Sequence, residues 1–378
     1  CVMAEYLSSP AKPRFLNLAF QDTVLPITRI TQPAFSEAAV AAANQRDSLA
    51  MISVTGFAVG ELLYQGPNSQ VFRARRERDG LAVVIKVPAS PDISIRENLR
   101  FQHEYDLLST LDLPRVIKVH DLVQYRSSFA IIEEDYGALD LEAHLGGRIL
   151  DAGGFLEVAA QMAESLAQLH AQRIIHKDVH LGNFLIHPGT GEVKLTDFGM
   201  SSLIEGEVLE PGNPDQIEGN LAYISPEQTG RMNRGVDSRS DLYSLGVCFY
   251  RMLTGELPFR SRDPMELLHA HIARKPSSPK DLNAFVPHAL SECAMRLLEK
   301  RSEDRYQSAT GLVRDLEEMR AEAAKGNSLA DMQLARWDMS GQFQVSQKIY
   351  GRDKEIQLLL ESFDHMTQGR AELLLVGG

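Results

Sequence analysis

The spacing of apolar and polar residues predicts strands in the first third of the chain. Over residues 57–86, short apolar runs alternate with turn signals at Gly66-Pro67-Asn68 and Asp79-Gly80, a pattern typical of antiparallel strands. Helical spacing follows over residues 98–111. Strand patterns return after Val119 and end in "FAIIEEDYG", so the sequence predicts a small sheet and one helix.

Helical patterns dominate the chain from Asp151 to about Lys325. In "FLEVAAQMAESLAQLH" a single apolar stripe indicates a helix that buries one face (Phe155, Val158, Met162, Leu166 and Leu169). A short hairpin interrupts the helices, formed by "NFLI", the turn "HPGTG" and "EVKLTDFG". A strand-rich part followed by a helical part predicts an α+β fold of two lobes.

The two ends of the chain depart from these patterns. Residues 1–50 are rich in Ala and Gln and show little periodicity. Because the chain begins with Cys1, we interpret them as a poorly ordered extension or a misassigned translation start, with Met51 as the alternative start. We expect a linker over residues 326–347, and residues 348–378 predict a helix, a turn and an apolar strand.

Composition and charge narrow the class of protein. The 378 residues are 44% hydrophobic and 24% charged, which is ordinary for a globular protein. A net charge of −12 argues against a protein that mainly binds nucleic acid or an anionic membrane. No apolar run approaches the ~20 residues of a membrane span, and no signal peptide is predicted. Cys1, Cys248 and Cys293 show no paired spacing, so we expect a cytoplasmic location.

The stretch "RIIHKDVHLGNFLI", residues 173–186, raises two alternatives. His176 and His180 stand four apart and could share one helix face as metal ligands. A zinc protease helix, however, reads H-E-x-x-H, and Lys177 replaces the glutamate that serves as general base. No Cys pair or downstream glutamate supplies an obvious third ligand, so the pattern disfavours metal ligation by these histidines.

The second alternative is phosphoryl transfer. His176, Lys177, Asp178 and Asn183 match H-R-D-x-x-x-x-N, in which the aspartate accepts a hydroxyl proton and the asparagine binds Mg²⁺. Fourteen residues after Asn183 comes Asp197-Phe198-Gly199, whose aspartate would chelate magnesium on the nucleotide phosphates. The two motifs in this order, around a hairpin, favour an enzyme that uses ATP and Mg²⁺.

From about residue 57 to 320 the chain resembles a protein kinase domain of the serine/threonine type. The resemblance implies a bilobal kinase-like fold, with an N-lobe over residues 51–135 and a C-lobe over residues 136–325. It also implies that Asp241 braces the catalytic loop and that Arg305 pairs with Glu227 of "SPE".

The same resemblance implies a role for each residue of the site. Lys86 of "VVIK", paired with Glu104, would hold the α- and β-phosphates, and Asp178 would accept the proton of a protein serine or threonine. His180 stands where a lysine usually contacts the γ-phosphate. Asn183 and Asp197 would hold Mg²⁺. The residues implied in ATP binding are Gly66, Ser69, Val71, Lys86, Glu134 and Tyr136.

Several positions depart from the family pattern. Only one of three expected glycines remains before Val71, since Tyr64, Gly66 and Ser69 occupy those positions. The remaining departures are Glu133 at a normally apolar position behind the adenine site, Lys177 for arginine, His180 for lysine and Asn220 for threonine.

The segment after the DFG motif is poor in hydroxyl groups. Between Met200 and Asn220 only Ser201 and Ser202 carry one. A lysine at position 177 also cannot grip a phosphate with the two parallel hydrogen bonds of an arginine. We therefore predict activity without phosphorylation of this segment.

A finer resemblance concerns the context of the domain. "AYISPEQTGRMNR" and "DSRSDLYSLGV" are similar to the kinase-like domain that opens large bacterial hybrid signalling proteins. In that family an AAA-type ATPase segment and sensor histidine kinase modules follow. Residues 348–378, which contain "YGRDKEIQLLL" and "ELLLVGG", resemble the truncated beginning of such an ATPase. The alternative is an extra helix and strand that pack on the kinase.

Three functions stay open at this point. The leading hypothesis is an ATP- and Mg²⁺-dependent serine/threonine protein kinase in bacterial signal transduction. The second is a pseudokinase-like module that binds nucleotide or a partner without turnover, favoured by the loss of two glycines from the glycine-rich loop and by His180. The third, a small-molecule kinase of the aminoglycoside type, usually lacks the "SPE" segment and its arginine partner, so it ranks last.

Overall fold

The computed structural model describes residues 52–90, 94–203, 219–232, 234–329, 332–338 and 362. The elements below belong to the unit Ser53–Gly378. The expectations for residues 1–50, for most of the linker after 329 and for the ATPase-like segment therefore lie outside the described residues.

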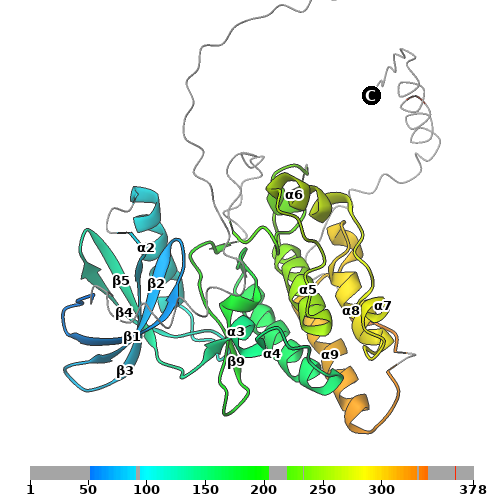
Figure 1. Ribbon diagram of the computed structural model, residues 1–378, viewed down its shortest axis with the longest axis horizontal. Helices are drawn as coiled ribbons and strands as arrows, with labels where there is room; N and C mark the ends of the chain where they lie inside the picture. The colour runs from blue at the N-terminus through cyan, green and yellow to red at the C-terminus, as the bar shows by residue number, and fades with distance from the viewer. Residues whose placement is uncertain are drawn as a thin grey trace, which may run out of the picture. The chain divides into compact units, whose positions relative to one another are not determined.

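The N-terminal part is a five-stranded antiparallel sheet in the order β1-β2-β3-β5-β4 (Figure 1). Alternation is clear on β3, where Val83, Ile85 and Val87 are buried on one face. The prediction of antiparallel strands is confirmed. The strands are β1 (Phe57–Gln65), β2 (Ser69–Arg76), β3 (Ala82–Pro88), β4 (Val119–Tyr125) and β5 (Ser128–Glu134).

The one helix of this part, α2 (Ile95–Ser109), begins three residues before the predicted start. A capping box explains the difference, because Glu97 N–H donates to Ser94 Oγ at 3.2 Å and Ser94 N–H donates to Glu97 Oε2 at 2.8 Å. The buried face of α2 carries one acidic side chain among apolar ones: Phe101, Glu104 and Leu108. A carboxylate on a buried helix face needs a cationic partner.

The rest of the described chain is mainly helical, so the predicted α+β class is confirmed. Short strands form two small sheets: β6 (Leu139–Asp140), β8 (Phe184–Ile186) and β9 (Val193–Leu195) in one, β7 (Ile174–Ile175) and β10 (Ser202–Leu203) in the other. The helices are α3 (Leu141–Leu145), α4 (Ala152–Ala171), α5 (Ser238–Thr254), α6 (Pro264–Ala273), α7 (Pro279–Leu282), α8 (His288–Leu297) and α9 (Ala309–Ala324), with 3₁₀ turns η1 (Leu181–Asn183), η3 (Glu227–Thr229) and η4 (Ser302–Asp304).

Helix α5 is the centre of the helical core, since almost all of its side chains are buried. It packs on α8, while α4 packs on α9 (Figure 1). A Cβ placed on Gly246 would lie 2.6 Å from Leu297 Cβ, so glycine is what allows α5 and α8 to approach this closely. Burying each large aliphatic side chain in such a core contributes roughly 1.5–3 kcal/mol.

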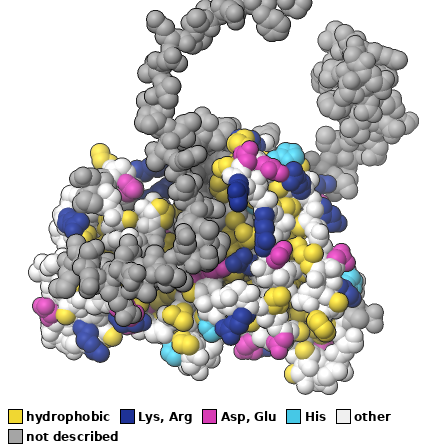
Figure 2. Space-filling view, viewed as in Figure 1, with side chains coloured by type: hydrophobic (Ala, Val, Ile, Leu, Met, Phe, Trp, Pro, Cys, Tyr) yellow, Lys and Arg dark blue, Asp and Glu magenta, His cyan; other side chains and the backbone are white. Residues whose placement is uncertain are grey.

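The surface mixes charges of both signs. On the face in Figure 2, Lys and Arg side chains are interspersed with Asp, Glu and apolar side chains. Within the part of the chain that the structure describes, no helix combines the length and the apolar character needed to cross a membrane.

Candidate active site

Lys86 connects three elements of the fold. Its Nζ lies 2.7 and 2.8 Å from the two carboxylate oxygens of Glu104 on α2, and 2.9 Å from Asp197 Oδ1 after β9. Burial disfavours a charged lysine, but the carboxylates of Asp197 and Glu104 raise the pKa of Lys86 above its usual value. The predicted pair of Lys86 with Glu104 is therefore present in the structure, and the lysine is cationic.

Asp197 is held in an unusual backbone conformation beside this lysine. Its φ of 64° lies in the left-handed region, which non-glycine residues rarely adopt. The next residue, Phe198, is buried, donates its N–H to Glu104 Oε1 at 3.1 Å and packs edge-on against His176. Burial alone would raise the pKa of Asp197, but Lys86 outweighs it and lowers that pKa, so the carboxylate is ionised.

Asp241, in the first turn of α5, anchors the loop that carries Asp178. Asp241 Oδ2 accepts the N–H of His176 and Oδ1 accepts the N–H of Lys177, each at 2.8 Å. Burial would raise the pKa of Asp241, but the hydrogen bond from His170 lowers it. The prediction that Asp241 braces this loop is confirmed.

Asp178, His180 and Asn183 come together as predicted. Asn183 Nδ2 donates to the Asp178 carbonyl at 2.8 Å, and Asn220 N–H donates to Asp178 Oδ1 at 3.2 Å. His180 Nδ1 accepts the Gly182 N–H at 3.1 Å, so a neutral ring carries its proton on Nε2, which lies 3.8 Å from Asp178 Oδ2. The Nε2–H of a neutral His180, a hydrogen-bond donor, thus lies beside the Asp178 carboxylate, an acceptor.

The oxygen atoms of Asn183 and Asp197 are suitable ligands for a hard cation such as Mg²⁺. Nδ2 of Asn183 is already a hydrogen-bond donor, so the amide Oδ1 and the Asp197 carboxylate are the oxygens that could bind Mg²⁺ together with phosphate oxygens. Across the described ranges there is no cluster of three or more His, Cys, Asp or Glu side chains that could hold a metal. His176 instead is buried, lies 3.1 Å from the Thr196 carbonyl through Nε2, and has a pKa lowered by burial.

The turn between β1 and β2 and the start of β2 carry three of the residues expected to bind nucleotide. Gly66 N–H donates to the Ser69 carbonyl at 2.9 Å, and Val71 lies opposite Lys86 on the neighbouring strand. The Tyr64 ring folds across Gly66, where any Cβ would collide with it. Tyr64 stands at an expected glycine position, and sequence reasoning did not foresee that its phenol covers the turn.

The segment after β5 is tied to the hairpin of β8 and β9. Glu134 Oε1 accepts from the Lys118 N–H at 2.9 Å and from Lys194 Nζ at 2.7 Å. Tyr136 donates its hydroxyl to Glu192 at 3.1 Å, and Lys194 lies over its ring. The side chains of Glu134 and Tyr136 are thus engaged in contacts within the protein.

Glu133 is a buried carboxyl on the same face of the sheet as Lys86. It lies directly opposite Val84, two residues from Lys86 on β3, and it is 5% exposed. Among the described residues no hydrogen-bond donor reaches its Oε1. Burial raises the pKa of Glu133 to about 8, so this group is largely protonated at neutral pH.

Two further contacts organise the segment that ends in "SPE". Arg305, which is fully buried, donates to both oxygens of Glu227 at 2.7 and 2.8 Å, as predicted. Ser201 is buried and its Oγ lies 3.3 Å from the His176 carbonyl, while Ser202 pairs with Ile175 in the small sheet of β7 and β10.

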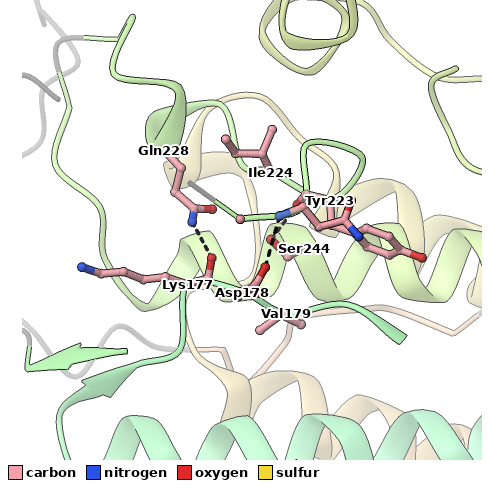
Figure 3. Close-up of a pocket in the computed structure, with 9 residues that line it drawn as sticks. Lys177, Asp178, Val179, Tyr223, Ile224, Gln228 and Ser244 are labelled. Atoms are coloured by element: carbon pink, nitrogen blue, oxygen red, sulfur yellow. Dashed lines mark hydrogen bonds between the residues drawn. The ribbon is translucent and has the colours of Figure 1, made fainter. Parts of the chain in front are cut away.

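A residue that the sequence analysis missed lies beside Asp178. Gln228, in η3, donates from Nε2 to the Lys177 carbonyl at 2.7 Å (Figure 3). The two residues are 51 positions apart, and no motif spacing connects them.

The chain is similar to known proteins over this region. The family model for the protein kinase domain matches residues 57–315, more than half of the chain. The hybrid signal transduction histidine kinase G of Dictyostelium discoideum is 39% identical over 176 residues, which are 41% of this chain and 5% of that protein.

Two bacterial relatives match over a longer stretch. A probable serine/threonine-protein kinase of Clostridium perfringens is 30% identical over 261 residues, 68% of this chain and 37% of that protein. The serine/threonine-protein kinase PknB of Mycobacterium tuberculosis is 30% identical over 269 residues, 69% of this chain and 42% of that protein. The chain therefore spans less than half the length of each of these relatives.

Proposed function

The chain belongs to the protein kinase family, and on that premise we propose that it transfers the γ-phosphoryl group of ATP to serine or threonine hydroxyls of a protein. The observation that carries the proposal is the Lys86–Glu104–Asp197 cluster, next to the loop that holds Asp178 and Asn183. The two bacterial relatives of this chain named above are a probable serine/threonine-protein kinase and the serine/threonine-protein kinase PknB.

Separate groups of the protein would bind the phosphates and the adenine of ATP. Lys86, oriented by Glu104, binds the α- and β-phosphates as a cation that is already in place before the reaction. The turn with Gly66 and Ser69, together with Val71, covers the nucleotide from the sheet. The backbone of the segment from Glu134 to Tyr136 binds the adenine.

Asp178 would accept the proton of the substrate hydroxyl as its oxygen attacks the γ-phosphorus. The new oxygen–phosphorus bond forms while the bond from the γ-phosphorus to the bridging oxygen breaks, and ADP leaves. The Nε2–H of His180, beside Asp178, is placed to donate to the transferred phosphoryl oxygens. The rate gain comes mainly from positioning and from charge stabilisation.

Asn183 and Asp197 would hold Mg²⁺, because an amide oxygen and an ionised carboxylate are ligands that this ion prefers. When bound, the ion neutralises negative charge on the nucleotide phosphates.

Transfer from radiolabelled ATP to a protein substrate, compared between wild type and Asp178→Ala, tests this function. We expect label from the wild type and none above background from the variant. Equal labelling by both proteins would refute the proposal.

A second candidate is a regulatory module that binds nucleotide without turnover. Two observations favour it: Tyr64 lies across Gly66 where a phosphate would approach the turn, and His180 stands where a lysine is usual. Thermal stabilisation by Mg-ATP without any transfer would support this candidate over the first.

We also propose that the domain acts in bacterial signal transduction in the cytoplasm, as one module of a larger hybrid protein. Its proposed boundaries are an N-lobe over residues 51–135 and a C-lobe over residues 136–325. The similarity to a hybrid signal transduction histidine kinase supports this context. Reading the gene beyond Gly378 tests it, since a G-x-G-K-[ST] motif of an ATPase is expected there.

A further inference from the structure

The residue before Asp178 has a strained backbone. Lys177 has a φ of 68°, in the left-handed region that disfavours every side chain with a Cβ. Such a conformation persists only where the surrounding contacts enforce it. Because Lys177 immediately precedes Asp178, its backbone angles set the direction of the Asp178 side chain.

Both backbone polar groups of Lys177 are held by side chains from distant elements. Its N–H donates to Asp241 Oδ1 at 2.8 Å. Its carbonyl accepts from Gln228 Nε2 at 2.7 Å, as Figure 3 shows. Asp241 acts from α5 and Gln228 from η3, so the strained peptide is gripped at both of its polar groups.

Ser225 fixes the orientation of the Gln228 side-chain amide, and this orientation allows Gln228 to donate to Lys177. The Gln228 Oε1 accepts from the Ser225 N–H at 3.1 Å and from Ser225 Oγ at 2.9 Å, which leaves Nε2 to face the Lys177 carbonyl. The neighbouring Glu227 is fixed by the buried Arg305. The support of Gln228 is therefore a rigid part of the helical core.

The same segment also contacts the Asp178 carboxylate. Asn220, eight residues before Gln228, donates its N–H to Asp178 Oδ1 at 3.2 Å. The sequence from 203 to 222 contains no serine, threonine or tyrosine, and Ser201 is buried. The contacts described above for Lys177 and Asp178 come from Gln228, Asp241 and Asn220, none of which carries a hydroxyl group.

We propose that Gln228 is a positioning residue, which keeps Asp178 in its working orientation through the Lys177 carbonyl and without a phosphorylated residue. This role rests on the proposed function, in which Asp178 accepts the proton of the substrate hydroxyl.

The first test replaces Gln228 by leucine, which removes the donor and keeps the size. We expect kcat to fall about 10- to 100-fold, because a small misplacement of a reacting group is costly, while KM for ATP changes less than about threefold. The experiment uses the whole chain, labelled ATP and a protein substrate.

Gln161 provides a matched control. It is also a buried glutamine that bridges distant backbone, since its Oε1 accepts from Val193 N–H at 2.9 Å and its Nε2 donates to the Gly191 carbonyl at 3.0 Å. Gln161→Leu should lower the unfolding midpoint and leave kcat within about twofold, because no such bridge reaches Asp178. An equal loss of kcat in both variants would reduce Gln228 to a general packing role and overturn the proposal.

The isosteric variant Gln228→Glu gives a pH signature. Its carboxylate still accepts from Ser225 but cannot donate to the Lys177 carbonyl, whereas the protonated carboxyl can. Activity relative to wild type should therefore rise as the pH is lowered from about 8 to about 5.5. A ratio that stays flat over this range contradicts the proposed donor role.

Hydrogen exchange separates this proposal from the proposed function. Gln228→Leu should speed amide exchange in residues 174–183 about tenfold or more and leave α4 unchanged. If the wild type transfers no more label than Asp178→Ala, the proposed function fails, and the exchange result alone decides whether Gln228 holds the loop. Unchanged exchange in that loop, or a kcat within twofold of wild type, would overturn the role of Gln228.

Discussion

Lys86 and Glu104 meet through two contacts of 2.7 and 2.8 Å between a strand and a helix that are both N-terminal to the loop of Asp178. The pair fixes α2 against β3, and the third partner, Asp197, connects both to the helical part of the fold. The ammonium group of Lys86 thus holds together β3, α2 and the segment after β9.

Replacing this cation should abolish most of the phosphoryl transfer. In Lys86→Met the phosphates lose a preorganised positive charge, and transfer should fall at least about 100-fold with weaker Mg-ATP binding. Lys118→Met, which removes an exposed partner of Asp112, is the control and should stay within about twofold. Single-turnover transfer and calorimetric ATP binding would check this, and an active Lys86→Met would contradict it.

Gly219 should matter through the Asp178 carboxylate. Its φ is 91°, and a Cβ there would lie 3.2 Å from Asp178 Oδ1. Gly219→Ala should lower kcat about tenfold, since both the backbone and the carboxylate must shift. Gly80→Ala is matched to it, because Gly80 has a φ of 73° and open space around it. That control should cost about 1 kcal/mol of stability and no activity, and a similar kcat for both variants would refute the prediction.

Breaking the Glu227–Arg305 pair should strongly destabilise the helical part. Arg305→Met removes the two charged hydrogen bonds to the buried Glu227 carboxylate, which keeps the hydrogen bond from Ser240, and the free energy of unfolding should fall by about 3–5 kcal/mol. Arg320→Met breaks an exposed pair with Glu157 and should cost less than about 1 kcal/mol. Urea unfolding of both variants measures the difference, and equal losses would be evidence against the buried pair.

Glu133 should make stability depend on pH. Its pKa is about 8 in the folded protein against an ordinary 4.5, so the folded state holds this proton more tightly than the unfolded state. Its contribution is therefore fully present below pH 4.5 and is lost as the pH rises towards 8. Glu133→Gln does not titrate, so its stability relative to wild type should increase over this window, by roughly 5 kcal/mol.

Unfolding curves at several pH values check this dependence. The exposed Glu317→Gln on α9 is the control and should show no such trend. A stability difference between Glu133→Gln and wild type that does not change with pH would show that Glu133 is ionised in the folded protein.

Much of the site could be predicted because its residues lie in short motifs. Asp178 and Asn183 share one loop, and Asp197 follows the next hairpin, so chain connectivity alone brings them near one another. The pairing of Lys86 with Glu104 required only one strand and the helix after it. The family pattern contains these spacings.

The remaining features depend on tertiary contacts that no spacing encodes. Gln228 reaches Lys177 across 51 residues, and the Tyr64 ring covers Gly66 only because the turn of β1 and β2 is tight. The burial of Glu133 follows from its register opposite Val84. The start of α2 was predicted too late, although Ser94 and Glu97 formed a recognisable capping box.

The packing of α4 on α9 has a consequence for synthesis on the ribosome. The apolar face of α4 is complete at Ala171, but its partner α9 begins only at Ala309. At translation rates of about 5–20 residues per second, the ribosome needs roughly 7–30 s to synthesise the residues between the end of α4 and the start of α9. During this interval the part of α4 that packs on α9 stays uncovered, so the nascent chain is more prone to aggregation until α9 has been synthesised.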